Sequence, residues 1–227
     1  LQNGKQEIKI GENDIWGTQI NRAGKEWKQY SMIVNIPDNK LVKFVFKPCA
    51  GDNNSLSGYD CKKADNVVYW FDKVTLEPTD EAGPGEGEEP ATELVKNGSF
   101  EKDFAADKQP GIYAAWQTQG NNTLNFLDMW FAKPDVTNPS LSIDTSTGAN
   151  GSNRSLKYTA EKVDNTWGVD LSYPLQGVNP GKYELSFYAK TNQTESPFIT
   201  SITLCENNED IAKEAKFQKA IVLQNGV

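Results

Sequence analysis

The sequence predicts an all-β protein, a sandwich of antiparallel sheets, on three observations. Aromatic and β-branched residues are plentiful, while Gly, Pro, Asn and Asp recur at short intervals along the 227 residues, as in chains of short strands joined by turns. Apolar and polar residues alternate with period two in several segments, which a half-buried strand requires. The clearest alternation follows a Pro-Gly turn within 165–191. It sets Tyr183, Leu185, Phe187 and Ala189 against Glu184, Ser186, Tyr188 and Lys190.

Residues 1–78 are expected to consist mainly of strands. The segment KQEIKI (5–10) is predicted as an edge strand, and the polar stretch 11–24 as a loop. A PDNK turn then reverses the chain between two alternating strands, and NVVYWFDKVTLEP (66–78) closes the block. The expected inward residues are Tyr30, Met32, Val34 and Ile36 before the turn, and Val42, Phe44 and Phe46 after it.

An acidic Gly/Pro segment, TDEAGPGEGEEPATE (79–93), is interpreted as a linker. It has no aromatic residue and cannot bury enough apolar surface to offset the entropy lost on ordering. An acidic surface loop within one domain is the alternative. A second block, 94–227, follows with further β-type segments. Its stretch DIAKEAKF (210–217) is interpreted as a loop or bent strand, although its propensity also allows a helical turn.

The charge and composition of the chain restrict its chemistry. The formal net charge of −8 and the pI near 4.7 argue against nucleic acid or an anionic membrane as partner, because phosphates would repel an acidic surface. The chain has no histidine, which removes Ser-His-Asp and Cys-His catalysis and His-based zinc sites. Only carboxylate chemistry remains among the common hydrolytic mechanisms, and a neutral ligand is the easiest to accommodate.

Three cysteines cannot all pair within one chain. Cys49 and Cys61 flank a loop short enough to be closed by a disulfide, and their redox state stays open, whereas Cys205 lies in an apolar run and is interpreted as a core residue. No run is long and apolar enough to cross a membrane, and no signal peptide is present. We therefore expect a region excised from a larger protein.

Motifs in both blocks resemble a family 4 carbohydrate-binding module, in the broader family 4/9/22 group attached to or inserted in bacterial xylanases and glucanases. LVKNGSFE, GSNRSLKYTA, a following Trp and LQGVNPGKYELSFYAKT are similar to the front of such a module. KEWKQYSMIVNIPDNKLVKFVFKP and VVYWFDKVTLEP are similar to its back. The resemblance implies a jelly-roll β-sandwich with a concave cleft.

The order of the two blocks departs from the family, because the back precedes the front. Residues 1–78 are therefore interpreted as the C-terminal part of a module, 79–93 as a linker, and 94–227 as the N-terminal part. Half a sandwich would expose its apolar face. The two parts are thus expected to complete one sandwich, either within the chain or by swapping in a dimer.

Sugar rings stack on aromatic planes, and their hydroxyls bond to carboxylates, amides and Arg. The resemblance implies that Trp167 is the main stacking residue and that Asp170 lines the cleft. By alternation alone Trp167 shares the face of Val169 and Leu171, so a core role is the alternative. Trp16, in polar surroundings, is expected to be a second platform. The weaker candidates for ligand binding are Gln19, Asn21, Arg22, Tyr188 and Trp116.

The remaining aromatic residues have less distinctive settings. Trp116, Trp130 and Phe131 belong to an aromatic-rich segment and are interpreted as either core or cleft wall. Trp27 and Trp70 lie in alternating strands and are interpreted as core.

The resemblance also implies a structural Ca²⁺ where the first and last strands of the module meet. Glu101 and Asp72 occupy the acidic positions of that site, and Gly98 and Ser152 fall where carbonyl ligands are expected. Calcium prefers several oxygen ligands of this kind. The alternative is a pair of solvated carboxylates near strand ends.

Three functional hypotheses follow. The first is non-catalytic binding of a β-linked plant polysaccharide, xylan before β-glucan, that concentrates an attached glycoside hydrolase at its substrate. Such a protein would be secreted, or held at the bacterial surface or in the periplasm. The second is an adhesion or protein-interaction sandwich. The third is a glycosidase, which needs two carboxylates across a cleft, and no acidic pair in an apolar setting marks one.

Overall fold

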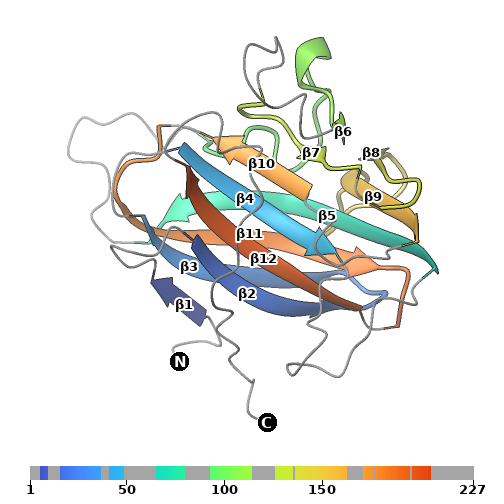
Figure 1. The fold of residues 1–227 in the computed structure, drawn as a ribbon, viewed down its shortest axis with the longest axis horizontal. Coiled ribbons are helices and arrows are strands. Elements are labelled where there is room, and N and C mark those ends of the chain that lie inside the picture. The colour runs from blue at the N-terminus through green and yellow to red at the C-terminus, as the bar shows by residue number, and fades with distance from the viewer. Residues whose placement is uncertain are drawn as a thin grey trace.

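Two sheets of six strands each make up the fold (Figure 1). The all-β sandwich predicted from the sequence is therefore confirmed, while the jelly-roll connectivity stays a prediction. One short 3-10 helix, η2 (Ala106–Lys108), is the only helical element of the described residues, and no helix there is long and apolar enough to cross a membrane. The computed structural model describes residues 6–9, 16–36, 41–48, 65–79, 93–113, 126–134, 136–162, 171–175, 177–194 and 196–205.

The first sheet, called sheet A, contains the longest strands. All its neighbouring strands are antiparallel except β1 and β3, which run parallel. The predicted edge strand near the start of the chain is confirmed, since β1 lies at one edge. The strand order is β1 (Gln6–Lys9), β3 (Lys28–Ile36), β11 (Gly181–Thr191), β5 (Asp65–Pro78), β9 (Ser155–Lys162) and β8 (Ser140–Asp144).

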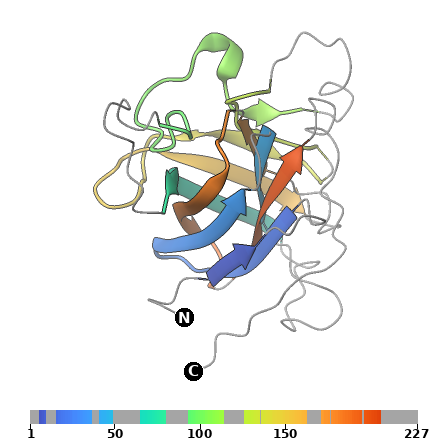
Figure 2. The same cartoon turned by 90° about the vertical axis from the view of Figure 1, so that its left-hand side faces the viewer.

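The second sheet, called sheet B, packs its inner face against sheet A. Its neighbours are also antiparallel, apart from the parallel pair β6 and β7. In both views η2 lies at the end of the sandwich far from β1 (Figures 1 and 2). The strand order is β2 (Trp16–Ala23), β12 (Ser196–Cys205), β4 (Leu41–Pro48), β10 (Leu171–Leu175), β7 (Phe131–Ala132) and β6 (Gly111–Ile112).

Strands from 1–78 and from 94–227 are interleaved in the middle of both sheets. In sheet A, β11 lies between β3 and β5, and in sheet B, β4 lies between β12 and β10. Blue strands accordingly stand beside orange ones in both views (Figures 1 and 2). The two ranges thus form one sandwich within this chain. Their interpretation as parts of a carbohydrate-binding module stays a prediction.

Phe187 on β11 lies at the centre of the core. Its ring centroid is 4.7 Å from that of Phe46, 5.6 Å from that of Tyr30 and 6.0 Å from that of Phe198. The inward faces predicted from alternation are confirmed, because every residue assigned to them is buried. A core built from both ranges explains why neither range needs to expose an apolar face.

The polar stretch 11–24 was predicted as a loop, and this is wrong for residues 16–23. They form β2, which pairs along its length with β12. The polar residues are accommodated by side-chain pairing: the Asn21 amide is buried and donates to Thr200 Oγ1 at 3.1 Å. A satisfied buried amide removes the cost that composition alone would assign to this strand.

Replacing Phe187 with Ala should lower the free energy of unfolding by about 3–5 kcal/mol, because a large core side chain leaves a cavity between both ranges. Chemical denaturation followed by circular dichroism measures this change. The control Ser31→Ala, on the outer face of β3, should change stability by less than about 0.5 kcal/mol. Two separate unfolding transitions in the wild type would contradict a single shared core.

Candidate functional site

A row of polar side chains lies on the outer face of sheet B, opposite the core. In the strand register Thr203 faces Lys43, and Ser201 faces Val45. The residues between them, among them Phe44 and Ile202, belong to the core, so alternation turns the polar set outward. We call this set the sheet B floor: Lys43, Val45 and Lys47 on β4, Ser172 on β10, and Ser201 and Thr203 on β12.

The floor is polar and yet nearly inaccessible. Lys43 and Lys47 are 2% and 1% exposed and interact with other groups of the chain. Ser201 and Thr203 are 0% and 8% exposed, and within the described part of the chain neither hydroxyl oxygen has a hydrogen-bond partner. Leaving such a group unpaired costs about 1–3 kcal/mol. Two unpaired hydroxyls on one outer face therefore call for a functional explanation.

Aromatic rings flank the floor beside β10. Phe131 faces Ser172 in the register, and its ring lies 4.9 Å from Phe126, which in turn lies 5.3 Å from Tyr113. The Asp128 N–H donates to the Pro174 carbonyl at 2.8 Å, which holds this segment on β10. Phe126, Met129 and Phe131 form a small apolar cluster separate from the main core.

The backbone of β2 places three candidate residues along the opposite edge of sheet B. Trp16 pairs with Thr203, Gln19 with Thr200, and Arg22 with Pro197. Thr203 belongs to the floor, whereas Thr200 lies on the core side of β12, the same side as Phe198 and Ile202. The register thus brings Trp16 beside the floor. Arg22 is exposed at the far end of β2.

A second row crosses the outer face of sheet A. The Lys190 ammonium lies 4.9 Å from the ring centroid of Trp27 and 5.0 Å from that of Trp70. The Lys157 ammonium also lies over Trp70, 5.6 Å from its ring centroid. Trp70 Nε1 donates to Asp144 Oδ2 at 2.9 Å. We call these five residues the Trp–Lys row. Each cation–π contact contributes about 0.5–1 kcal/mol at an exposed site.

Tyr188 lies next to this row and not beside the floor. Its hydroxyl accepts a hydrogen bond from Asn150 Nδ2 at 2.7 Å and donates to Gln29 Oε1 at 3.2 Å. The prediction that Tyr188 belongs to the polar face of its strand is confirmed, because its side chain is only partly buried. Since sheet A and sheet B present opposite outer faces, Tyr188 does not join Trp16 and Arg22 in one site.

The aromatic interpretations have mixed outcomes. The prediction that Trp27 and Trp70 are core residues is wrong, because both are half-buried on the outer face. There the Lys190 ammonium lies over both rings. Trp130 is core, at 0% exposed, and Phe131 is buried beside the floor. Trp167, Asp170, Trp116 and the pair Cys49 and Cys61 lie outside the described residues.

Asp72 is fully buried and already has its hydrogen bonds. Its Oδ1 accepts the Lys73 N–H and its Oδ2 accepts the Ala149 N–H, both at 2.7 Å. Burial raises the pKa of Asp72, and these two bonds together with the Ser152 hydroxyl oppose the increase. The alternative that Asp72 is a solvated carboxylate is therefore wrong.

The other residues assigned to calcium do not converge on Asp72 as ligands. The Gly98 carbonyl accepts the Val74 N–H at 2.9 Å, Ser152 Oγ donates to the Arg154 carbonyl, and Glu101 is exposed. Across the described ranges no three acidic, Cys or His residues gather as a metal-binding group. In these positions the residues do not fit a calcium site, so no role is assigned to a metal. The structural Ca²⁺ that the resemblance implies stays a prediction.

Some of the floor was missed by sequence reasoning although its signal was present. Assigning Val42, Phe44 and Phe46 to the core also assigns Lys43 and Lys47 to the opposite face. The same reasoning applies to Ser201 and Thr203, which alternate with Ile202 and Leu204. Pairing of β4 with β12, which joins the two sets, is not visible in the sequence.

Comparisons of this chain with protein-family models, with curated proteins and with solved structures yield no match.

Asp144 should stabilise the protein in a pH-dependent way. Burial raises the pKa of Asp144, but hydrogen bonds from Ser146, Trp70 and Lys157 outweigh burial and hold that pKa well below its usual value of 3.8. A lowered pKa in the folded state contributes stability that is complete above pH 3.8 and is lost as the pH falls below it. The stability difference between wild type and Asp144→Asn, from urea unfolding, should be present at pH 7 and shrink below pH 3.8.

Asp72→Ala should lower the free energy of unfolding by about 2–4 kcal/mol, because two backbone N–H groups lose their acceptor. The loss should be the same with and without EDTA. Glu101→Ala, at an exposed position, serves as the control and should change little. If EDTA lowered the wild-type melting temperature to that of the variant, Asp72 would hold a metal after all.

Proposed function

We propose that the chain is a non-catalytic carbohydrate-binding module that binds β-linked plant polysaccharide, xylan first and β-glucan second, on the sheet B floor. The observation that supports this most directly is the pair of buried hydroxyls, Ser201 and Thr203, without a partner in the described residues. Sugar hydroxyls both donate and accept, so they suit serine and threonine oxygens. The resemblance to family 4 modules supports the same ligand class.

The surroundings of the two hydroxyls also suit a sugar chain. Lys43 and Ser172 lie on the same face, and the backbone register places Trp16 opposite Thr203 and Phe131 opposite Ser172. Aromatic planes are the surfaces on which pyranose rings stack. Because the floor is buried in this structure, binding requires the face to open, which lowers the association rate.

Two further buried nitrogens lack a hydrogen-bond partner among the described residues, but their settings do not suit a ligand. Trp130 Nε1 is enclosed in the core, with Tyr173 at 4.7 Å and Phe46 at 5.9 Å from its ring. Arg154 Nε belongs to a guanidinium whose Nη2 donates to Asp103. Among the described residues, the floor combines two unpaired hydroxyls with further polar side chains on one outer face.

The settings of Asp72 and Asp144 support binding without cleavage. A glycosidase needs two carboxylates facing a substrate. Asp72 is enclosed by backbone donors, and Asp144 accepts from Trp70 and Ser146. Both therefore act as acceptors that hold the outer face of sheet A. In this proposal an attached glycoside hydrolase performs the chemistry, and the module raises its effective concentration on the polysaccharide.

Thr203→Val should weaken binding to xylan about tenfold, since one hydrogen bond to the ligand is lost. The same change should leave the melting temperature unchanged or raise it, because it removes an unpaired buried hydroxyl. Affinity electrophoresis in xylan and in β-glucan gels, together with calorimetric melting, measures both effects.

The matched control is Thr200→Val on the opposite face of the same strand. It removes the acceptor of the Asn21 amide, so it should lower stability and leave affinity unchanged. A wild type that migrates freely in every glycan gel would reject the binding assignment and favour a protein-interaction sandwich. Release of soluble sugars from the same polysaccharides would instead indicate a glycosidase.

A further inference from the structure

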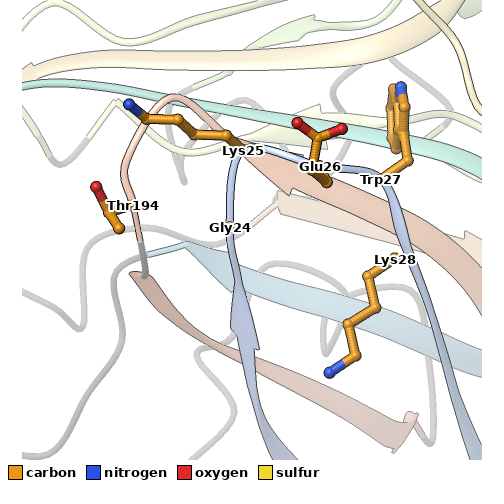
Figure 3. Close-up of a pocket in the computed structure, with 6 residues that line it drawn as sticks. All are labelled: Gly24, Lys25, Glu26, Trp27, Lys28 and Thr194. Atoms are coloured by element: carbon orange, nitrogen blue, oxygen red, sulfur yellow. The ribbon is translucent and has the colours of Figure 1, made fainter.

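The Trp–Lys row ends in an aromatic ring beside an open depression. Trp27 lines a depression of about 590 Å³ together with Gly24, Lys25, Glu26, Lys28 and Thr194 (Figure 3). The depression lies between the β2–β3 turn and the connection that follows β11. Each of these connections joins a strand of sheet A to a strand of sheet B, and no residue of the sheet B floor lines the depression.

Among the described residues, one lysine of the row lies over the Trp27 ring. Lys190 lies 4.9 Å from the Trp27 ring and donates to Thr147 Oγ1 at 2.7 Å, so the ammonium that supports the ring is itself fixed. Trp70, in contrast, has both Lys190 and Lys157 over its ring. Within the described ranges, Trp27 is thus the member of the row that has one lysine over it and also lines the depression.

A ring held in this way is suited to stacking. The cost of immobilising a side chain on binding is about 0.5–1.5 kcal/mol, and Lys190 has already restricted Trp27. Figure 3 shows the side chains of Lys25, Glu26 and Trp27 on one side of the turn and Lys28 pointing to the other side. In this view Glu26 lies between Lys25 and Trp27, so its carboxylate acceptor is the nearer of the two charged groups to the half-buried ring.

We infer that Trp27 is the stacking residue of a second glycan subsite, separate from the sheet B floor. It takes the C–H face of one pyranose ring in a β-linked chain, while Lys25 donates to ring hydroxyls and Glu26 accepts from them. The ligand class rests on the proposed function. The position does not, because it follows from the row and the depression. Two separate sites bind different stretches of polysaccharide, which raises avidity without further contacts.

Isothermal titration calorimetry with xylohexaose tests the inference through stoichiometry. Wild type should bind two ligands per chain, and Trp27→Ala should bind one, with the melting temperature nearly unchanged because the ring is half exposed. Trp27→Phe should keep the second site with affinity reduced by up to about tenfold. Glu101→Ala, at an exposed position outside both proposed sites, should bind as wild type does.

The variants separate the two sites. If Trp27→Ala bound xylohexaose with wild-type stoichiometry and affinity, the second subsite would be rejected while the floor would stand. If Trp27→Ala abolished all binding and Thr203→Val changed nothing, the Trp27 subsite would be supported and the floor rejected. If no protein bound xylohexaose, cellohexaose or either polymer, both assignments would be rejected.

Discussion

The insertion of β11 between β3 and β5 is the constraint on which the rest of the structure depends. This strand belongs to the range 94–227, and both its neighbours belong to 1–78. Because side chains alternate along a strand, β11 sends Phe187 into the core and Lys190 to the outer face. One pairing event therefore fixes the centre of the core and the middle of the Trp–Lys row together.

An irregularity in β5 adapts that pairing to the outer face. The register between β11 and β5 shifts between Ser186 and Tyr188, where Lys73 has a φ of 50°. An extra residue of this kind bends a strand and redirects the side chains beside it. Asp72 precedes the irregularity and accepts the N–H of Ala149, which anchors the β8–β9 connection. Asp144 at the start of that connection then bonds to Trp70.

The sequence predicts the fold better than the sites, for a physical reason. Alternation determines which face of a strand is buried, and it correctly assigned Phe187, Phe44 and Met32 to the core. It does not determine which strands are neighbours, so the meeting of Lys43 with Thr203 could not be anticipated. Trp27 and Trp70 were misassigned because a tryptophan in a strand is usually buried. Here pairing with lysines makes an outer position favourable.

The two outer faces show different signs of function. On sheet A the polar groups satisfy one another: Lys190 reaches Thr147, and Lys157 and Trp70 share Asp144. Such a network stabilises the sheet and leaves little for a ligand except at its end, where Trp27 borders the depression. On sheet B the hydroxyls of Ser201 and Thr203 are buried and have no hydrogen-bond partner in the part of the chain that the structure describes. Unpaired buried hydroxyls lower stability, and such groups occur at sites where they later bind a ligand. The outer face of sheet B is therefore the stronger candidate for the principal site.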